Sequence, residues 1–203
     1  MIPPNPKVLA IYGSPRGGGN TDLLLAQAVT GARKGGVDVE EVFLRELNMA
    51  PCAEDYGCLK NGRCVIDDDF QEVYDRLSSC QGLMLSSPVF FCAVSAHTKI
   101  LMDRCQSFWV RKNLLGHSLQ DKSGQVRKGL FISAAARQSP RNNFDGTLAS
   151  VRHFFAALDV ELWKSLLYAG VDRCGDILQR REALEECREA GAELARLLLS
   201  GLP

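Results

Sequence analysis

A glycine-rich segment near the start of the chain, residues 13–21, limits most strongly what this sequence can fold into. It follows a short apolar run, Lys7–Tyr12, that is typical of a buried strand, and apolar residues at helical spacing begin after it. The segment therefore joins a strand to a helix. Because the first amides of a helix lack intrahelical partners and carry the positive end of its dipole, such a turn can bind a phosphate.

The side chains in this segment favour the same ligand. Ser14, Asn20 and Thr21 offer short polar groups, Gly19 lets the backbone come close, and Arg16 adds a positive charge that can pair with phosphate. The alternative is an ordinary connection in which an Asn or Thr caps the helix and the glycines serve only the turn.

Two common nucleotide sites are excluded. A Walker A loop requires a lysine before its final Ser or Thr, but here Asn20 precedes Thr21. The dinucleotide motif G-x-G-x-x-G has a second glycine two residues after the first, where this chain has Pro15. A single phosphate monoester fits the segment better than either.

Composition indicates one globular domain over residues 1–203, with 46% hydrophobic and 24% charged residues. Lys and Arg together equal Asp and Glu at 24 each, so no excess of basic charge favours nucleic acid. The first residues lack the apolar core of a signal peptide, and no apolar run is long enough for a membrane span. We therefore expect a cytoplasmic protein that binds neither nucleic acid nor membrane.

Apolar runs and helical patterns alternate along the chain. The predicted strands cover residues 7–12, 38–44, 82–87, 129–134 and 160–168, and the predicted helices begin near residues 21, 70, 95, 148 and 177. We expect the helix after Ser95 to continue to about Phe108, residues 109–127 to be irregular, and Asp68 or Asp69 to cap the helix near residue 70. The alternation predicts an α/β fold, a doubly wound five-stranded parallel sheet of order 2-1-3-4-5 with helices on both faces.

A second candidate binding segment follows the predicted third strand. Pro88 ends that strand, and Val89, Phe90 and Phe91 are apolar although they occupy a loop. Ligands bind at the carboxyl ends of strands in doubly wound sheets, so these residues are candidates for contact with a flat ring. In the alternative, the two phenylalanines only cover the core.

Small residues after the predicted fourth strand, which include Ala135 and Ala136, would let backbone approach the same flat ligand. A plain loop is the alternative here.

Three of the eight cysteines, Cys52, Cys58 and Cys64, cluster in a long loop at residues 45–67, which lacks periodicity. The other five are dispersed. In a reducing compartment these thiols stay free, and only the clustered group has the spacing of a site.

Three sets of residues together resemble the flavodoxin-like NADPH-dependent FMN reductases, and in particular their iron-sulfur flavoprotein branch. They are Gly13-Ser14-Pro15-Arg16 with Asn20-Thr21, Ser87-Pro88-Val89-Phe90 with Ser95-Ala96 and Lys99 to Asp103-Arg104, and Cys52 to Cys64 followed by Val65-Ile66-Asp67-Asp68-Asp69. The resemblance spans about residues 7–180. It implies that Ser14, Arg16, Asn20 and Thr21 hold the FMN phosphate. By the same likeness, residues 88–91 lie along the isoalloxazine ring, with Ala135 and Ala136 on its other side.

The chain departs from this branch in the cysteine loop. Proteins of the branch hold a [4Fe-4S] cluster with four cysteines, and Asp55 stands where we would place the remaining one. The alternatives are a cluster with an unusual ligand, zinc bound by three thiolates and a carboxylate, or three free thiols.

The resemblance implies an FMN-dependent oxidoreductase that takes a hydride from NAD(P)H and reduces a quinone, a flavin or a similar acceptor. The alternatives are an electron carrier between protein partners and a non-enzymatic ligand-binding or zinc-stabilised module. The resemblance also implies a homodimer or homotetramer. No catalytic side chain is predicted, because His97, His117 and His153 are scattered.

Overall fold

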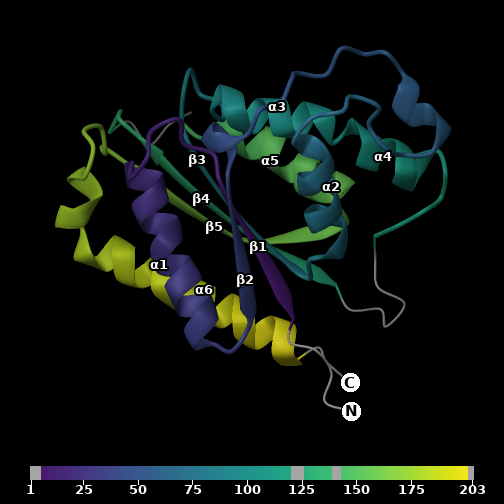
Figure 1. Cartoon of the computed structure of the whole chain (residues 1–203). Helices are drawn as coiled ribbons and strands as arrows, with labels where there is room; N and C mark the ends of the chain where they lie inside the picture. Colours follow the sequence, from purple (N-terminus) through teal and green to yellow (C-terminus); the bar gives the residue numbers. More distant parts are fainter. Residues whose placement is uncertain (1–5, 120–125, 139–142, 201–203) are drawn as a thin grey trace.

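The computed structural model describes residues 6–119, 126–138 and 143–200 and contains a five-stranded parallel sheet of order β2-β1-β3-β4-β5 (Figure 1). This order confirms the predicted topology. The strands are β1 (Lys7–Tyr12), β2 (Asp38–Phe43), β3 (Gly82–Pro88), β4 (Arg127–Ala135) and β5 (Val160–Ala169).

Helices cover both faces of the sheet (Figure 1). One face packs against α1 (Asn20–Lys34) and α6 (Arg181–Ser200), and the other against α2 (Phe70–Ser79), α3 (Ala96–Arg104), α4 (Gln106–Asn113) and α5 (Asp145–Ala157). Alternate strand residues feed the two cores: Val8 and Met84 point to the α1/α6 side, whereas Leu9 and Leu83 point to the other. Burial on both faces explains why the central strands β1, β3 and β4 are nearly continuous apolar runs, while the edge strands β2 and β5 are only partly buried.

The helices α1 and α6 cross so closely that glycine is required at the contact. A β-carbon on Gly31 would lie 1.9 Å from the carbonyl oxygen of Arg188, and one on Gly191 would lie 1.9 Å from that of Ala28. This contact holds the first helix, and with it the preceding glycine-rich loop, against the C-terminal helix.

The helix predicted from Ser95 to about Phe108 is wrong in its length, because two helices occupy this region. The Ser95 hydroxyl caps α3 as expected, accepting a hydrogen bond from the Thr98 amide at 3.2 Å. The chain then turns at Cys105, whose amide bonds to both Leu101 O and Met102 O at 3.1 Å, and α4 continues to Asn113. Residues 109–113 are therefore helical, and not irregular as predicted, and residues 120–125 lie outside the described part of the chain.

The last predicted helix is also divided. A 3-10 turn, η3 (Asp176–Gln179), precedes α6, and Arg180 separates them. The Arg180 guanidinium donates to Ala169 O at 2.8 Å and Gly170 O at 2.7 Å. These hydrogen bonds tie Arg180, the residue between η3 and α6, to the end of β5.

The loop predicted at residues 45–67 carries two 3-10 turns, η1 (Leu44–Glu46) and η2 (Gly57–Lys60). Leu44 belongs to η1 and not to the second strand. Asp68, rather than Asp69, binds the first amide of α2, since its Oδ1 accepts from Phe70 N at 3.1 Å while Asp69 accepts from Asn48 N at 2.6 Å. Within the described residues, no helix combines the length and apolar character needed to cross a bilayer.

Candidate functional site

The three predicted ligand-binding segments meet at the carboxyl edge of the sheet. Tyr12 pairs with Ser86 on the neighbouring strand, and Pro88 pairs with Ala134 on the next. Two further backbone hydrogen bonds, Gly13 N to Ser86 O at 2.8 Å and Val89 N to Ala134 O at 3.0 Å, join the loops beyond the strand ends. The residues that the sequence analysis selected in these three loops are therefore brought to one place.

The glycine-rich loop is shaped by Ser14. This residue is 4% exposed, and its hydroxyl donates to Arg16 O at 2.9 Å and accepts from Arg16 N at 3.1 Å. The hydroxyl hydrogen is thus used inside the loop, while the Arg16 side chain is exposed and has no partner among the described residues. Gly19 is buried and is the N-cap residue of α1.

Asn20 connects this loop to the chain after β5. Its Nδ2 donates to Arg173 O at 2.8 Å, and its Oδ1 accepts from Ile177 N at 3.3 Å. Thr21 is 2% exposed in the first turn of α1. Asn20 therefore orders the loop, and one of its amide hydrogens remains for a ligand.

Two residues outside the predicted set, Asp22 in α1 and Arg45 in η1, also lie against this loop. Asp22 accepts hydrogen bonds from Gly18 N at 3.2 Å and from Arg45 Nη1 at 2.8 Å. Residue spacing gave no signal for the pair, because the two residues are 23 positions apart and are brought together by the pairing of β1 with β2.

The segment after β3 forms a tight turn of unusual conformation. Phe91 and Cys92 have φ values of 51° and 60°, and Phe90 and Ala93 exchange two backbone hydrogen bonds of 2.9 and 3.0 Å. Such left-handed conformations are strained for residues other than glycine. The Phe90 amide is used by the turn, which leaves the amides of Phe91 and Cys92 without a backbone acceptor among the described residues.

The phenylalanines do not cover the core. Phe90 is 48% exposed and Phe91 is fully exposed, while Pro88 and Val89 are half-buried. Their side chains are accessible to a ligand, as expected for a flat-ring platform.

On the other side of the edge, Ala135 is the last residue of β4 and is buried, and Ala136 follows it and is exposed.

Ser95 links the turn to the glycine-rich loop. Its hydroxyl donates to Gly13 O and lies 3.0 Å from Thr98 Oγ1. Gly13 is required here, since a β-carbon would lie 2.1 Å from Thr98 Oγ1 and 2.6 Å from Ser86 O. The positions of the two loops are therefore coupled.

The residues at this edge fit a flavin mononucleotide. The first amides of α1 have no helical partner, and Arg16 supplies the charge that a phosphate requires. The Ser86 hydroxyl is completely buried on the α1 face of the sheet and has no hydrogen-bond partner within the described parts of the chain. A buried hydroxyl of this kind is satisfied by a polar ligand or a water. The edge therefore has a candidate anion-binding loop and, in addition, a hydroxyl that can hydrogen-bond to a ligand.

The three clustered cysteines line one small cavity of about 190 Å³ between the cysteine loop and α4. Other lining residues include Asp55, Arg104 and Trp109. Burial raises the pKa of the Cys58 thiol, and the neighbouring Cys64, Cys52 and Asp55 raise it further. The sequence analysis therefore grouped residues that are close in space.

Arg104, which is 1% exposed, holds the cysteine loop in place. Its Nε donates to Cys64 Sγ at 3.1 Å, Nη1 donates to Asp68 Oδ2 at 2.6 Å and Ala50 O at 2.8 Å, and Nη2 donates to Asp68 Oδ1 at 3.0 Å and Ile66 O at 3.3 Å. All five guanidinium hydrogens are thus used.

Among the described residues, no three His, Cys, Asp or Glu side chains are arranged to hold a metal ion. Asp55 is exposed, and its Oδ1 accepts from Gly57 N at 2.8 Å, which makes it a turn-forming residue. The arrangement therefore does not fit a cluster or zinc as it stands, and metal binding by Cys52, Cys58 and Cys64 stays a prediction.

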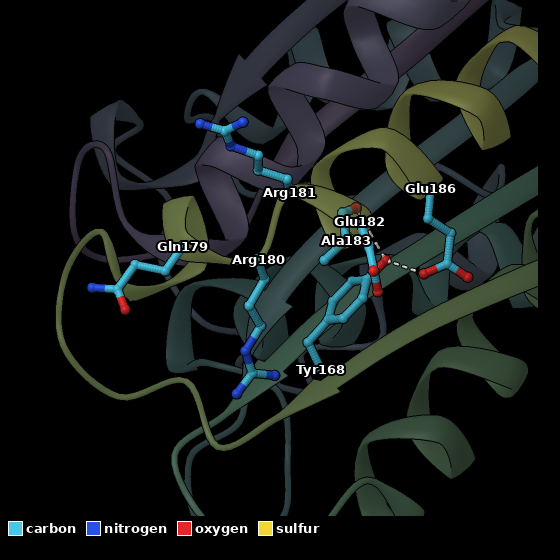
Figure 2. A pocket seen from close by; sticks show the side chains of 7 residues that line it. All are labelled: Tyr168, Gln179, Arg180, Arg181, Glu182, Ala183 and Glu186. Carbon is cyan, nitrogen blue, oxygen red and sulfur yellow. Dashed lines mark hydrogen bonds between the residues drawn. The ribbon is translucent and has the colours of Figure 1, made fainter.

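A separate hollow of about 780 Å³ lies where β5 meets the start of α6 (Figure 2). Figure 2 shows the Tyr168 hydroxyl directed toward Glu186, to which it donates at 2.7 Å, and Arg180 directed toward the end of β5. The lining residues are Tyr168, Gln179, Arg180, Arg181, Glu182, Ala183 and Glu186. None of them is among the predicted cofactor residues, so this hollow is distinct from the carboxyl-edge site.

Comparison with known proteins identifies the family. The model of the NADPH-dependent FMN reductase family matches residues 6–160. An iron-sulfur flavoprotein of Methanocaldococcus jannaschii is 34% identical over 149 residues, which cover 73% of this chain and 71% of that protein. An iron-sulfur flavoprotein of Methanosarcina thermophila is 34% identical over 98 residues, covering 48% of this chain and 51% of that protein. A Bacillus subtilis protein that bears the name of an NAD(P)H-dependent FMN-containing oxidoreductase is 27% identical over 179 residues, 88% of this chain and 92% of that protein.

Solved structures show the same fold. An NAD(P)H:quinone oxidoreductase from Methanothermobacter marburgensis has a TM-score of 0.66 at 17% identity, covering 94% of this chain and 97% of that one. An FMN-dependent NADH-azoreductase from Bacillus anthracis, solved in complex with FMN, has a TM-score of 0.64 at 16% identity, covering 94% and 99%. Because the family model matches most of this chain, residues 6–160, the chain belongs to the NADPH-dependent FMN reductase family.

Proposed function

We propose that this FMN- and NAD(P)H-dependent oxidoreductase binds the flavin at the carboxyl edge of the sheet and reduces a quinone, a free flavin or a similar small acceptor. The observation that carries the proposal is the meeting of the glycine-rich loop, the Phe90–Ala93 turn and the end of β4 at one edge. Quinone reductase and azoreductase activities in the names of structural neighbours support a small acceptor.

Bound FMN supplies the chemistry of hydride acceptance and electron donation, and the protein binds and orients it. The amides at the start of α1, together with Arg16, hold the phosphate. Pro88, Val89, Phe90 and Phe91 lie along the ring on one side, and Ala135 and Ala136 on the other. The amides of Phe91 and Cys92 are the donors that tune the ring, because the Phe90 amide is already bonded within its turn.

No side chain is assigned as a proton donor or acceptor. His97 is half-buried, and His117 and His153 are exposed, and all three lie outside the three edge loops.

Anaerobic titration with NADPH and with NADH tests the proposal. We expect the flavin absorbance to bleach within the mixing time and to return on addition of a quinone or free flavin. If the flavin bleaches only with a reduced ferredoxin, the small-acceptor function is wrong.

A second candidate is an electron carrier in which flavin exchanges electrons with protein partners. The relatives named iron-sulfur flavoproteins support it. The variant D55C supplies a fourth thiol to the loop. Under this candidate, anaerobic reconstitution loads iron into D55C to a higher stoichiometry than into the parent, whereas equally low iron in both proteins argues against it.

We further propose a homodimer or homotetramer. Phe91 is fully exposed and Trp109 is 45% exposed, so both aromatic side chains are accessible to a subunit contact. Light scattering coupled to gel filtration gives the mass, and a monomer at micromolar concentration contradicts the proposal.

A further inference from the structure

A buried carboxylate lies directly against the proposed phosphate loop. Asp22, 6% exposed, is in the first turn of α1, and its Oδ2 accepts from Gly18 N within the loop. Its second oxygen, Oδ1, is buried and has no hydrogen-bond partner in the described structure. An acidic group in this position opposes the binding of a phosphate dianion, because like charges repel strongly where water is scarce.

Arg45 compensates this charge from the other side of the loop. Its Nη1 lies 2.8 Å from Asp22 Oδ2, and its guanidinium stacks on the Phe43 ring at 4.8 Å from the centroid. A β-carbon on Gly17 would lie 3.7 Å from Arg45 Nε, which places the guanidinium against the loop backbone. The Arg45 side chain is only 18% exposed, so water screens the pair weakly.

The surroundings show why the compensation is needed. Burial raises the pKa of Asp22, and the charge of Arg45 acts in the opposite direction. Glu46 also faces this site, at 3.5 Å from Arg45 Nη2, and Tyr12 lies near enough for the Asp22 charge to affect its pKa. Arg45 is therefore the cation that pairs with Asp22 beside the proposed anion site.

We propose that Arg45, positioned by Asp22 and Phe43, neutralises the Asp22 carboxylate, and that this compensated pair sets the preference of the loop for phosphorylated over unphosphorylated flavin. Both residues act on the phosphate through their charges, and neither is assigned a direct contact with the flavin. The inference rests on the proposed FMN site and adds residues that determine its specificity.

The test is a set of dissociation constants for FMN and for riboflavin, measured by quenching of flavin fluorescence with the flavin-free full-length chain. Two unit charges about 10 Å apart at an effective dielectric constant of about 20 change affinity about tenfold. We therefore expect R45M to bind FMN about tenfold more weakly and riboflavin unchanged, since riboflavin has no phosphate to repel.

Two further variants make the pattern specific. In the double variant D22N/R45M both charges are absent, so FMN affinity should return to within about threefold of the parent, and R45K, which keeps a cation, should stay near the parent. Circular dichroism confirms that each variant is folded before titration.

Equal weakening of FMN and riboflavin in R45M would overturn the inference, because the pair would then only support the loop backbone. A double variant as weak as R45M would also overturn it. Failure of the phosphate site itself gives a different result: the parent would bind FMN and riboflavin equally, and R16A would change neither constant.

Discussion

The glycine-rich loop and the cysteine loop are held in place by different kinds of contact. Residues 13–19 offer mostly backbone groups to a ligand. Ser14 orders this segment from within the loop, and Gly13, Asn20 and Asp22 order its borders. Residues 45–67 instead depend on side chains, chiefly the buried Arg104 and its ion pair with Asp68. A backbone site needs only the correct conformation, whereas a thiol site needs the correct number of ligands in addition.

This difference bears on how well each loop fits the ligand predicted for it. The glycine-rich loop has the features of an anion site in sequence and in structure. The cysteine loop keeps three thiols around one cavity but has Asp55 in a turn-forming role. A loop held by Arg104 can thus keep its shape whether or not a metal binds.

The largest expected effect is at Arg104. The variant R104Q removes most of the support for the cysteine loop and leaves Asp68 buried without its partner, so we expect the free energy of unfolding to fall by about 3–5 kcal/mol. Urea denaturation followed by circular dichroism measures it. The matched control is R76Q, whose ion pair with Glu72 is exposed and whose loss should cost no more than about 1 kcal/mol. Equal effects in the two variants would contradict the role of Arg104.

A smaller loss of stability is expected when a β-carbon is added at Gly13 in the glycine-rich loop. The added β-carbon in G13A conflicts with Thr98 Oγ1 and Ser86 O, which should cost about 1–3 kcal/mol of stability and weaken FMN binding. Thermal melts and flavin titration measure both quantities. In the control G17A the new carbon lies 3.7 Å from Arg45, an ordinary contact, and we expect both quantities to be nearly unchanged. Should G13A behave like G17A, close packing at Gly13 is not what places the loop.

Removing one charge from the glycine-rich loop should affect ligand and not fold. In R16A the loss of a charge-assisted hydrogen bond to phosphate should weaken FMN binding by about tenfold or more, with riboflavin binding and the melting temperature unchanged. The control is R152A, because Arg152 is exposed on α5 away from the edge. Unchanged FMN affinity in R16A would remove Arg16 from the phosphate site.

The smallest effect is a pH dependence of opposite sign in the two loops. Burial alone raises the pKa of Asp68, but hydrogen bonds from Arg104 and from the amides of Ala50 and Phe70 bring it below its ordinary value of 3.8. The contribution of Asp68 is therefore present above that pH and is lost as the pH falls through the lowered pKa. Burial raises the pKa of Asp22 above 3.8, so its contribution is present at acid pH and is lost as the pH rises through the raised pKa.

Urea denaturation of the parent, D68N and D22N across pH 3 to 8, on the order of one measurement per unit, checks both signs. The stability difference between parent and D68N should shrink toward acid pH. D22N resembles the protonated Asp22 at every pH, so it should match the stability of the parent at acid pH and become the more stable of the two as the pH rises. The same slope for both variants would contradict the contrast between the loops.

The central strands β1, β3 and β4 could be predicted well because they are buried on both faces and read as nearly continuous apolar runs, whereas the edge strands β2 and β5 carry polar residues among their apolar ones. The break at Cys105 could not, since apolar spacing continues through it from Leu101 to Phe108 and only the local hydrogen bonds end the first helix. Arg45 was missed for a related reason: it is 23 residues from Asp22, and only the parallel pairing of β1 with β2 brings the two together.

The sequence by itself determined the alternation of strands and helices, the glycine-rich composition of residues 13–21 and the grouping of three cysteines, because each is a local pattern of residue type and spacing. Only the tertiary structure decided that three loops meet at one edge, that Arg45 pairs with Asp22 beside the glycine-rich loop, and that Arg104 holds the cysteine loop. These are contacts between residues distant in the chain, and their geometry follows from the packing of the sheet and its helices.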